Sequence, residues 1–281
     1  MAGRFWKIIA ALAWAGAAWT MAAVEKGKDF SIEGVGIEMV WMTPGTFTMG
    51  SPEEEWGRDK AEGVQREVTL TKGFWIGRTE VTQAQYEAVA GMNPSRFTEV
   101  GPDAPVERVS WLDATAWCKK LTERERAAGR LPDGYVYALP TEAQWEYACR
   151  AGTEGAPMYL EEVAWYEENS GGITHRVAQK KPNAWGLYDM LGNVLEWCRD
   201  WYGDYARTAE TDPRGPAHGY FRMARGGSWR VGAAVCRPAA RAGGSSGRRD
   251  YTIGFRVGLC AVEGRKNVGF EPQRHRDTER E

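Results

Sequence analysis

The sequence predicts an α+β fold with many irregular loops, and three observations support this prediction. Capping boxes indicate helices, all of which begin before Gly152. Stretches in which apolar and polar residues alternate indicate strands. Beyond Gly152 the helical periodicity fades, and glycine, aspartate, asparagine and tryptophan alternate until Leu259. With 34 glycines and 14 tryptophans in the chain, we expect a compact fold whose loops are pinned by aromatic side chains.

The first strand-like stretch occupies residues 36–49 and closes on Met49, Gly50 and Ser51. A charged loop follows at residues 52–63. Residues 67–76 then alternate like a second strand.

Three helices are predicted from their caps. The capping boxes are Thr82 with Gln85, Ser110 with Asp113, and Thr141 with Gln144. Gly91 stands where the first helix should end, and Gly152 ends the third. The second helix carries an apolar stripe at three- and four-residue spacing, formed by Trp111, Ala114, Trp117, Cys118 and Leu121.

The two ends of the chain differ from its middle. Residues 1–23 resemble a secretory signal peptide, because Arg4 and Lys7 precede the apolar run 8–19 and small residues follow it. That run is short for a membrane span, which takes about 20 residues. A retained signal anchor is the alternative. We therefore expect a secreted or periplasmic protein with no stable membrane span after cleavage, and a charged, flexible tail at residues 261–281.

Composition limits the classes of partner and cofactor. A net charge of −2 and no dense basic patch argue against nucleic acid. The three histidines, His175, His218 and His275, are widely separated, which argues against a histidine-rich metal centre. The five cysteines contain no CxxC pair, so a zinc knuckle is disfavoured. In an exported protein they could form disulfides, or they could be small buried apolar residues.

The segment GLYDMLGNVLEW, residues 186–197, places two carboxylates and an amide around a glycine turn. Asp189, Asn193 and Glu196 supply side-chain oxygens, and the flanking apolar residues should anchor the loop in a core. Such a loop suits a hard cation. A turn whose Asp and Asn satisfy local backbone donors is the alternative.

Seven motifs, in this order, resemble the formylglycine-generating enzyme family, also called the sulfatase-modifying-factor domain. They are FTMGS (47–51), EVTQAQY (80–86), PVERVSWLDATAWC (105–118), LPTEAQWEYACRAG (139–152), GLYDMLGNVLEW (186–197), RGGSW (225–229) and IGFR (253–256). The resemblance covers residues 36–260. It implies a C-type-lectin-like α+β fold that is low in regular secondary structure and stabilised by metal and disulfides.

The resemblance leaves several functions open. The family contains copper-dependent oxidases that convert a sulfatase cysteine to formylglycine, iron-dependent sulfoxide synthases, periplasmic proteins of siderophore maturation, and ligand-binding receptors. In the oxidases two cysteines after RGGSW bind Cu(I), and here the first position is Val231 while the second is Cys236. Copper is therefore not expected. The iron branch is disfavoured because its additional helical domain and histidines are missing from this sequence.

The resemblance also implies a disulfide between Cys149 and Cys236. Such a bridge would stabilise the fold by about 4 kcal/mol in the loop-entropy model. Cys118 and Cys260 lie near positions that are paired in the oxidases, although Cys260 falls late.

For calcium, the family pattern implies side-chain ligation by Asp189 and Glu196, with the carbonyls of Gly192 and Val194 completing much of the shell. Leu195 replaces the usual tryptophan, which packs and does not ligate. The acidic loop of a second calcium site is short here, so we expect one structural calcium ion.

The cleft that the resemblance implies includes residues 230–235 and 242–251. Its candidate ligand-binding residues are Arg230, Arg248, Arg249, Asp250 and Tyr251. An ordinary solvated loop is the alternative. Ser228 and Cys236 would be catalytic candidates only in an enzyme, and no base near Ser228 in sequence activates it as a nucleophile.

The first functional hypothesis is an exported protein of this fold that lacks the copper oxidase chemistry and binds a peptide, glycan or other ligand in the cleft beside RGGSW. The competing hypothesis is a divergent formylglycine-generating enzyme, or a related periplasmic oxidase or maturation factor. A structural subunit of a surface assembly is the third.

Overall fold

The structure is a computed structural model that describes residues 24–63 and 65–262. The expected signal at residues 1–23 and residues 263–281 of the expected tail lie outside the described residues. Within the described ranges, no helix is long and apolar enough to cross a membrane.

Helices are few in these two ranges, and the longest of them spans Trp111–Ala127. The helices are α1 (Gln83–Ala90), α2 (Trp111–Ala127), α3 (Glu142–Arg150), α4 (Leu160–Val163), and the 3₁₀ turns η1 (Lys60–Glu62), η2 (Thr98–Val100) and η3 (Ala233–Val235). The strands are β1 (Phe30–Ile32), β2 (Ile37–Met42), β3 (Gly45–Met49), β4 (Arg66–Leu70), β5 (Phe74–Gly77), β6 (Tyr135–Ala138), β7 (Ala164–Trp165), β8 (Leu191–Gly192), β9 (Leu195–Trp201), β10 (Glu210–Thr211), β11 (Arg222–Arg225), β12 (Arg241–Gly244), β13 (Ile253–Gly254) and β14 (Gly258–Ala261). The prediction of a mixed fold with long irregular connections is confirmed.

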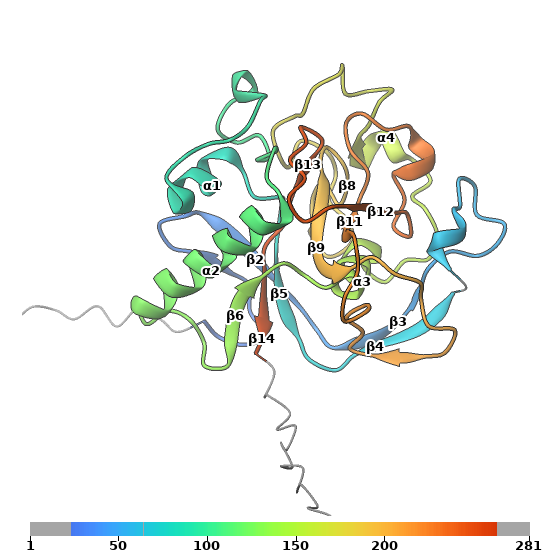
Figure 1. The fold of residues 1–281 in the computed structure, drawn as a ribbon, viewed down its shortest axis with the longest axis horizontal. Coiled ribbons are helices and arrows are strands. Elements are labelled where there is room, and N and C mark those ends of the chain that lie inside the picture. Colours follow the sequence, from blue (N-terminus) through green and yellow to red (C-terminus); the bar gives the residue numbers. More distant parts are fainter. Residues whose placement is uncertain (1–23, 64, 263–281) are drawn as a thin grey trace, which may run out of the picture.

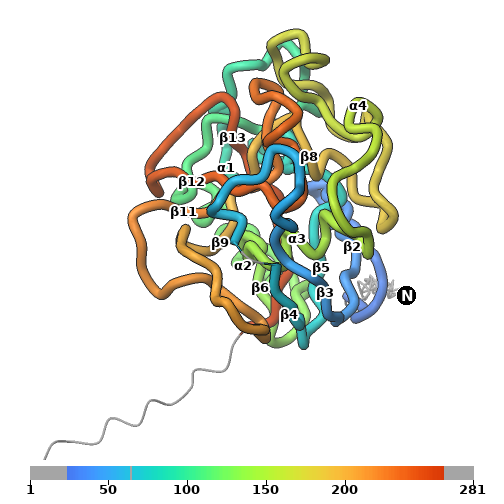
Figure 2. Tube along the Cα trace, turned by 90° about the vertical axis from the view of Figure 1, so that its right-hand side faces the viewer, coloured from blue at the N-terminus to red at the C-terminus, as the bar shows by residue number. Residues whose placement is uncertain are grey.

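The strands form several small sheets (Figures 1 and 2). The largest has the order β1-β2-β5-β14-β6, so the last strand of the described chain lies between two earlier ones. A four-stranded sheet has the order β12-β11-β9-β13, and β10-β4-β3 and β7-β8 form the others. Helices α1 and α2 pack together at one side of the molecule, with α2 against β6, while α3 lies among β3, β9 and β11.

Two apolar clusters fill the molecule. One lies between α1, α2 and the five-stranded sheet and contains Trp75, Trp117 and Phe255. The other surrounds α3 and contains Trp145 and Phe74. Each cluster gathers residues that are distant in the sequence, so the sheets and helices depend on one another for stability.

The predicted caps are confirmed. Thr82, Ser110 and Thr141 each accept a hydrogen bond from the backbone of the third helical residue, and the side chain of that residue bonds back. Gly91 ends α1 in the left-handed conformation, with a φ of 86°. The third helix ends one residue earlier than expected, at Arg150, because Ala151 already has left-handed angles.

Both expected strands are broken in two, which corrects the sequence prediction. The first divides into β2 and β3 around Thr43 and Pro44, since proline has no N–H to donate to a ladder. The second divides into β4 and β5. Gly73 there lies against the Trp41 indole, and a Cβ would stand 2.2 Å from that ring.

The charged loop at residues 52–63 is more ordered than its composition suggests. It contains η1, which Asp59 caps. Glu62 is only 1% exposed and bonds to Arg237, and its oxygens also accept hydrogen bonds from the Ser51 hydroxyl, at 2.5 Å, and the Asp59 backbone. The loop is thus tied to the segment that follows RGGSW.

Arg225 of RGGSW and Arg241 of β12 bind acids inside the core. Arg225 bonds to Glu146 and to the carbonyl of Ala240, and it is fully buried. Arg241 makes a two-pronged contact with Glu142, at 2.6 and 2.8 Å. These ion pairs connect α3 to β11 and β12 and place RGGSW against the core.

Asp200 gives a pH-dependent prediction. Burial, reinforced by the nearby Glu142 carboxylate, raises the pKa of Asp200 to about 7, whereas an unfolded Asp titrates near 3.9. Between these values the folded chain holds a proton that the unfolded chain lacks, so this group's contribution to stability falls as the pH rises from about 4 to about 7. Asp200→Asn keeps an acceptor for the Glu142 N–H, 2.9 Å away, but cannot ionise.

We expect the variant to lose less stability than the parent between pH 5 and pH 8, by about 1–3 kcal/mol. Urea unfolding at both pH values measures the difference. Parallel pH dependences in the two proteins would contradict the assignment.

Candidate functional site

The loop of residues 186–197 runs into β8 and β9 through a strained turn. Asp189 and Asn193 have φ angles of 52° and 49°, a region that Asp and Asn tolerate better than most residues. Gly192 lies so close to β7 that a Cβ would stand 2.2 Å from the Trp165 carbonyl oxygen. The turn therefore needs glycine at this position, and it holds Asp189 and Glu196 in the interior.

One of the two carboxylate oxygens of Asp189 has no hydrogen-bond partner. Its Oδ2 accepts a hydrogen bond from the Ala178 N–H at 2.7 Å, while its buried Oδ1 has no partner. Burial raises the pKa of Asp189 to about 6. A buried oxygen without a hydrogen-bond partner lowers the stability of the fold. A cation bound at this oxygen would supply the missing partner.

Glu196 is held on the other side of the cluster. The Trp145 indole N–H donates to its Oε2 at 2.7 Å, and the Arg256 guanidinium donates to both oxygens at 2.8–3.2 Å. Arg256, in the IGFR motif, is itself fully buried and also reaches the carbonyls of Gly77 and Tyr188. A carboxylate has about four lone-pair positions, so Glu196 can still offer one to a metal ion.

Glu80 completes the cluster and was not among the predicted site residues. Its side chain is 1% exposed and accepts from the Val194 N–H and the Asn193 amide, each at 3.4 Å. Burial, together with the charges of Asp189 and Glu196, raises the pKa of Glu80 well above its usual range. The only sequence signal for it was the EVTQAQY motif, which by itself indicates no cation.

The residues present fit a calcium ion. Three buried carboxyls, Glu80, Asp189 and Glu196, share the single guanidinium of Arg256, and one oxygen is unpartnered. No three His, Cys, Asp or Glu side chains converge as a complete metal site in the part of the chain that the structure describes. The proposed set has only two such side chains and takes its other two oxygens from the backbone carbonyls of Gly192 and Val194, which calcium also accepts as ligands.

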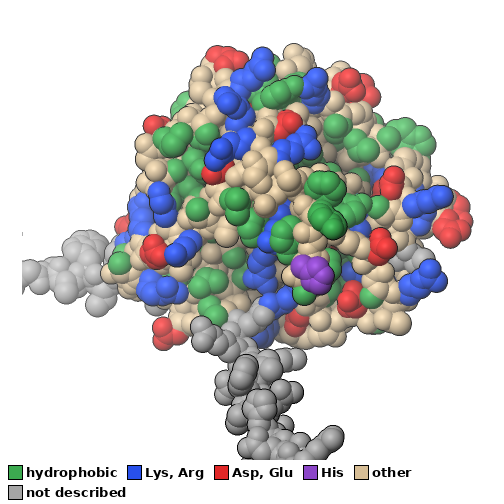
Figure 3. Space-filling model, in the orientation of Figure 1, with side chains coloured by type: hydrophobic (Ala, Val, Ile, Leu, Met, Phe, Trp, Pro, Cys, Tyr) green, Lys and Arg blue, Asp and Glu red, His purple; other side chains and the backbone are tan. Residues whose placement is uncertain are grey.

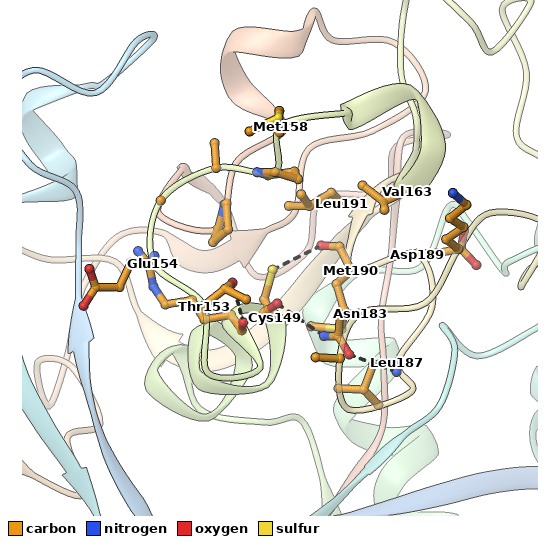
Figure 4. Close-up of a pocket in the computed structure, with 17 residues that line it drawn as sticks. Cys149, Thr153, Glu154, Met158, Val163, Asn183, Leu187, Asp189, Met190 and Leu191 are labelled. Atoms are coloured by element: carbon orange, nitrogen blue, oxygen red, sulfur yellow. Dashed lines mark hydrogen bonds between the residues drawn. The ribbon is translucent and has the colours of Figure 1, made fainter.

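A cavity of about 340 Å³ lies behind this loop (Figure 4). Leu187, Met190 and Leu191 form one wall, and Cys149 and Met158 lie on other sides. The Asn183 side chain, which lies at the cavity, is bonded to the backbone of α3 and of its own loop. The wall of the cavity is therefore mostly apolar, and the Asn183 side chain in it already has hydrogen-bond partners within the protein.

The cysteines are all buried, and the structure contains no disulfide among the described residues. Cys149 Sγ lies 4.0 Å from the Met190 carbonyl oxygen, and Cys236 packs against Gly227. The bridge between Cys149 and Cys236, like the pairing of Cys118 with Cys260, is not formed in the structure and stays a prediction.

The positions of the expected catalytic candidates do not favour catalysis. Cys236 and Ser228 are both fully buried. Burial raises the pKa of the Cys236 thiol to about 12, so it stays protonated at neutral pH, whereas the thiolate is the reactive and metal-binding form. The Ser228 hydroxyl lies 3.4 Å from the Arg230 backbone nitrogen, and among the described residues no histidine or carboxylate forms a hydrogen bond with it.

Beside RGGSW, two of the predicted ligand-binding residues meet. The Arg230 guanidinium donates to the Tyr251 hydroxyl and lies 5.2 Å from the centre of its ring. Tyr251 stacks on Trp229 at 5.8 Å, and Phe97 packs edge-on against Trp229 at 5.4 Å. Arg96, which the sequence did not single out, also lies 5.2 Å from the Tyr251 ring. We call these five residues the arginine–aromatic cluster.

The other predicted binding residues have partners of their own. Arg248 pairs with Asp250 at 2.9 Å, and Asp250 also accepts from Thr252. Arg249 makes a two-pronged contact with Asp113 at the start of α2. Of the five predicted ligand-binding residues, the structure thus pairs Arg230 with Tyr251 and Arg248 with Asp250, whereas Arg249 contacts Asp113. Figure 3 shows Lys and Arg side chains, with acids among them, at the top of the view where Figure 1 places β13.

A profile of the family described as "Sulfatase-modifying factor enzyme 1-like domain" matches residues 31–259. The chain belongs to this family. The match begins and ends close to the bounds of the expected domain, residues 36–260. It contains the loop of residues 186–197, RGGSW and the arginine–aromatic cluster.

Relatives within the family carry different names. A formylglycine-generating enzyme of Streptomyces coelicolor is 33% identical over 183 residues, which are 55% of this chain and 52% of the relative. "Chaperone protein LppX" of Paenibacillus barcinonensis is 33% identical over 218 residues, covering 60% of this chain and 74% of the relative. The chain thus spans only about half of the Streptomyces enzyme.

Solved structures confirm the fold. Treponema denticola variable protein 1 is 33% identical, with a TM-score of 0.72 over 82% of this chain and 98% of that one. PvdO from Pseudomonas aeruginosa is 28% identical, with a TM-score of 0.71 over 84% of this chain and 99% of that one. The expected formylglycine-generating-enzyme fold is therefore confirmed.

Proposed function

We propose that this protein is an exported member of the family that binds a peptide, glycan or other ligand in the cleft beside RGGSW and does not carry out copper-dependent oxidation. The observation that carries this proposal is the pair of positions 231 and 236. The side chain of Val231 offers no atom that could bind copper. Cys236 is a buried thiol whose pKa is raised to about 12. A Cu(I) centre of two thiolates is not available in this arrangement.

The ligand-binding part of the proposal is supported by the arginine–aromatic cluster. Arginine, tryptophan and tyrosine are the residues that contribute most to binding at protein interfaces. The name of the relative from Paenibacillus barcinonensis, a chaperone protein, supports a peptide or protein ligand in particular.

The scaffold of this site would be stabilised by one calcium ion. Asp189 and Glu196 would hold it through their side chains, and Gly192 and Val194 through their carbonyls. The ion would supply positive charge to a cluster that is rich in buried carboxyls. Its role is to fix the loop, because the cluster is closed to solvent.

The test of this function is turnover of a sulfatase-derived peptide that contains a Cys-x-Pro-x-Arg core, supplied with Cu(I) and oxygen and analysed by mass spectrometry. We expect no conversion of cysteine to aldehyde in protein that is folded and calcium-loaded. A known formylglycine-generating enzyme assayed in parallel is the positive control. Conversion by this chain would establish the competing hypothesis, a divergent oxidase.

A further inference from the structure

We infer that the arginine–aromatic cluster recognises an acidic peptide segment, one that presents two carboxylates to Arg96 and Arg230. This inference rests on the proposed function, since it names the ligand class of that same cleft. It adds Arg96 to the site and assigns a charge to the ligand.

The first argument is the convergence of two positive charges on one ring. The guanidinium carbons of Arg96 and Arg230 each lie 5.2 Å from the centre of the Tyr251 ring. Both side chains are exposed. Like charges repel each other, and an anion that binds both guanidinium groups would remove the repulsion.

The second argument is the lack of a counter-charge. No ion pair reaches Arg96 or Arg230 among residues 24–63 and 65–262, whereas Arg248 and Arg249 in the same loop are paired with acids. Glu107 lies beneath Arg96 and accepts from the Phe97 N–H at 2.8 Å. It is fully buried and accepts hydrogen bonds from the backbone N–H groups of Arg96 and Phe97, so it forms no ion pair with either guanidinium of the cluster.

Two further acids lie near Arg230 in the structure, and neither supplies it with a counter-charge. Glu167 and Glu168 lie beside Gly232, and the Glu167 N–H bonds to the Val231 carbonyl. Neither side chain forms an ion pair with Arg230 in the described structure.

The shape of the cluster favours a peptide over a glycan. A sugar ring stacks on an open aromatic face, but Trp229 is only 7% exposed and Tyr251 is half-buried, with two guanidinium groups near its ring. Guanidinium forks match carboxylates in a two-pronged geometry. Carboxylates at positions i and i+2 of an extended peptide stand about 7 Å apart, so one short segment can present a carboxylate to each arginine.

The test uses fluorescein-labelled peptides of one length and background, Gly-Ser-Glu-Ala-Glu-Ser-Gly, its Glu→Gln counterpart and its Glu→Arg counterpart. Binding is measured by fluorescence anisotropy at low and at physiological salt. We expect the glutamate peptide to bind at least about fivefold more tightly than the glutamine peptide, with the arginine peptide weakest and the difference smaller at higher salt.

Variants locate the binding on the protein. Arg96→Gln and Arg230→Gln should each weaken the glutamate peptide at least about fivefold. Lys119→Gln, on the exposed face of α2 with 78% side-chain exposure, removes the same charge elsewhere and should leave binding unchanged. Circular dichroism confirms that each variant is folded.

The outcomes separate this inference from the proposed function. Equal binding of the glutamate and glutamine peptides, or equal losses in Arg96→Gln and Lys119→Gln, overturns the inference. Preferred binding of a sulfated hexasaccharide or of the glutamine peptide, abolished by Tyr251→Ala, also overturns it but leaves the cleft a ligand site. If no probe in the set binds, the acidic-peptide inference is overturned and the cleft loses its support as a ligand site.

Discussion

Replacing Arg256 by methionine is expected to lower the free energy of unfolding by about 3–5 kcal/mol, the usual cost of removing one partner of a buried ion pair. The Arg256 guanidinium pairs with Glu196, and the buried carboxyls of Glu80 and Asp189 lie close enough to interact with its charge. Methionine fills much of the volume but leaves these groups without a cation. Two backbone carbonyls, of Gly77 and Tyr188, lose their donors as well.

Urea unfolding followed by tryptophan fluorescence measures the loss. Arg249→Met is the matched control, because that side chain is 61% exposed and its contact with Asp113 lies at the surface; no resolvable change is expected there. Arg256→Lys, which keeps the charge without the planar fork, should fall between the parent and Arg256→Met. The double variant Arg256→Met with Glu196→Gln should recover part of the loss. A loss below about 1 kcal/mol in Arg256→Met would contradict the role given to Arg256.

Calcium is expected to produce the second large effect. A ligand that binds only the folded chain stabilises it by about 2.7 kcal/mol at one hundred times its dissociation constant. We therefore expect the melting temperature of chelator-treated protein to rise by several degrees on adding calcium. Magnesium should have less effect, because it demands a smaller, near-octahedral site.

Asp189→Asn should abolish the calcium-dependent shift, since it removes the charge of the carboxyl with the unpartnered oxygen. Asp133→Asn, an exposed position, makes the same change away from the loop and should retain the shift. Calorimetry should give one ion per chain. A full shift in Asp189→Asn, or none in the parent protein, would refute the assignment.

Local signals in the sequence predicted the helices well. Each capping box depends on residues three positions apart, so no knowledge of the remaining chain was needed to place α1, α2 and α3. Pro44 and Gly73 also mark the strand breaks in the sequence. The apolar alternation on either side of each breaker nevertheless predicts one continuous strand. The close approach of Gly73 to Trp41 could not be predicted, because it depends on the pairing of β2 with β5.

The site was predicted only in part, for a physical reason. Asp189 and Glu196 lie in one motif, whereas Glu80 reaches them from the segment between β5 and α1, more than a hundred residues earlier. Arg96 likewise meets Tyr251 only after folding. Pairwise contacts between distant segments leave no periodic pattern in the sequence. Val231, in contrast, was informative by itself, because the valine side chain has no atom that could bind copper in place of a cysteine thiolate.

The position of β14 has a consequence for how the chain acquires its structure. This strand follows all the others in the sequence, yet it pairs with β5 on one side and β6 on the other. While the chain is being synthesised, the largest sheet therefore cannot close until residues 258–261 have left the ribosome. A nascent chain that ends before Gly258 would expose two open strand edges, and such edges invite aggregation. This sheet should thus reach its full strand order only after β14 is available, and until then its strands stay open to wrong partners.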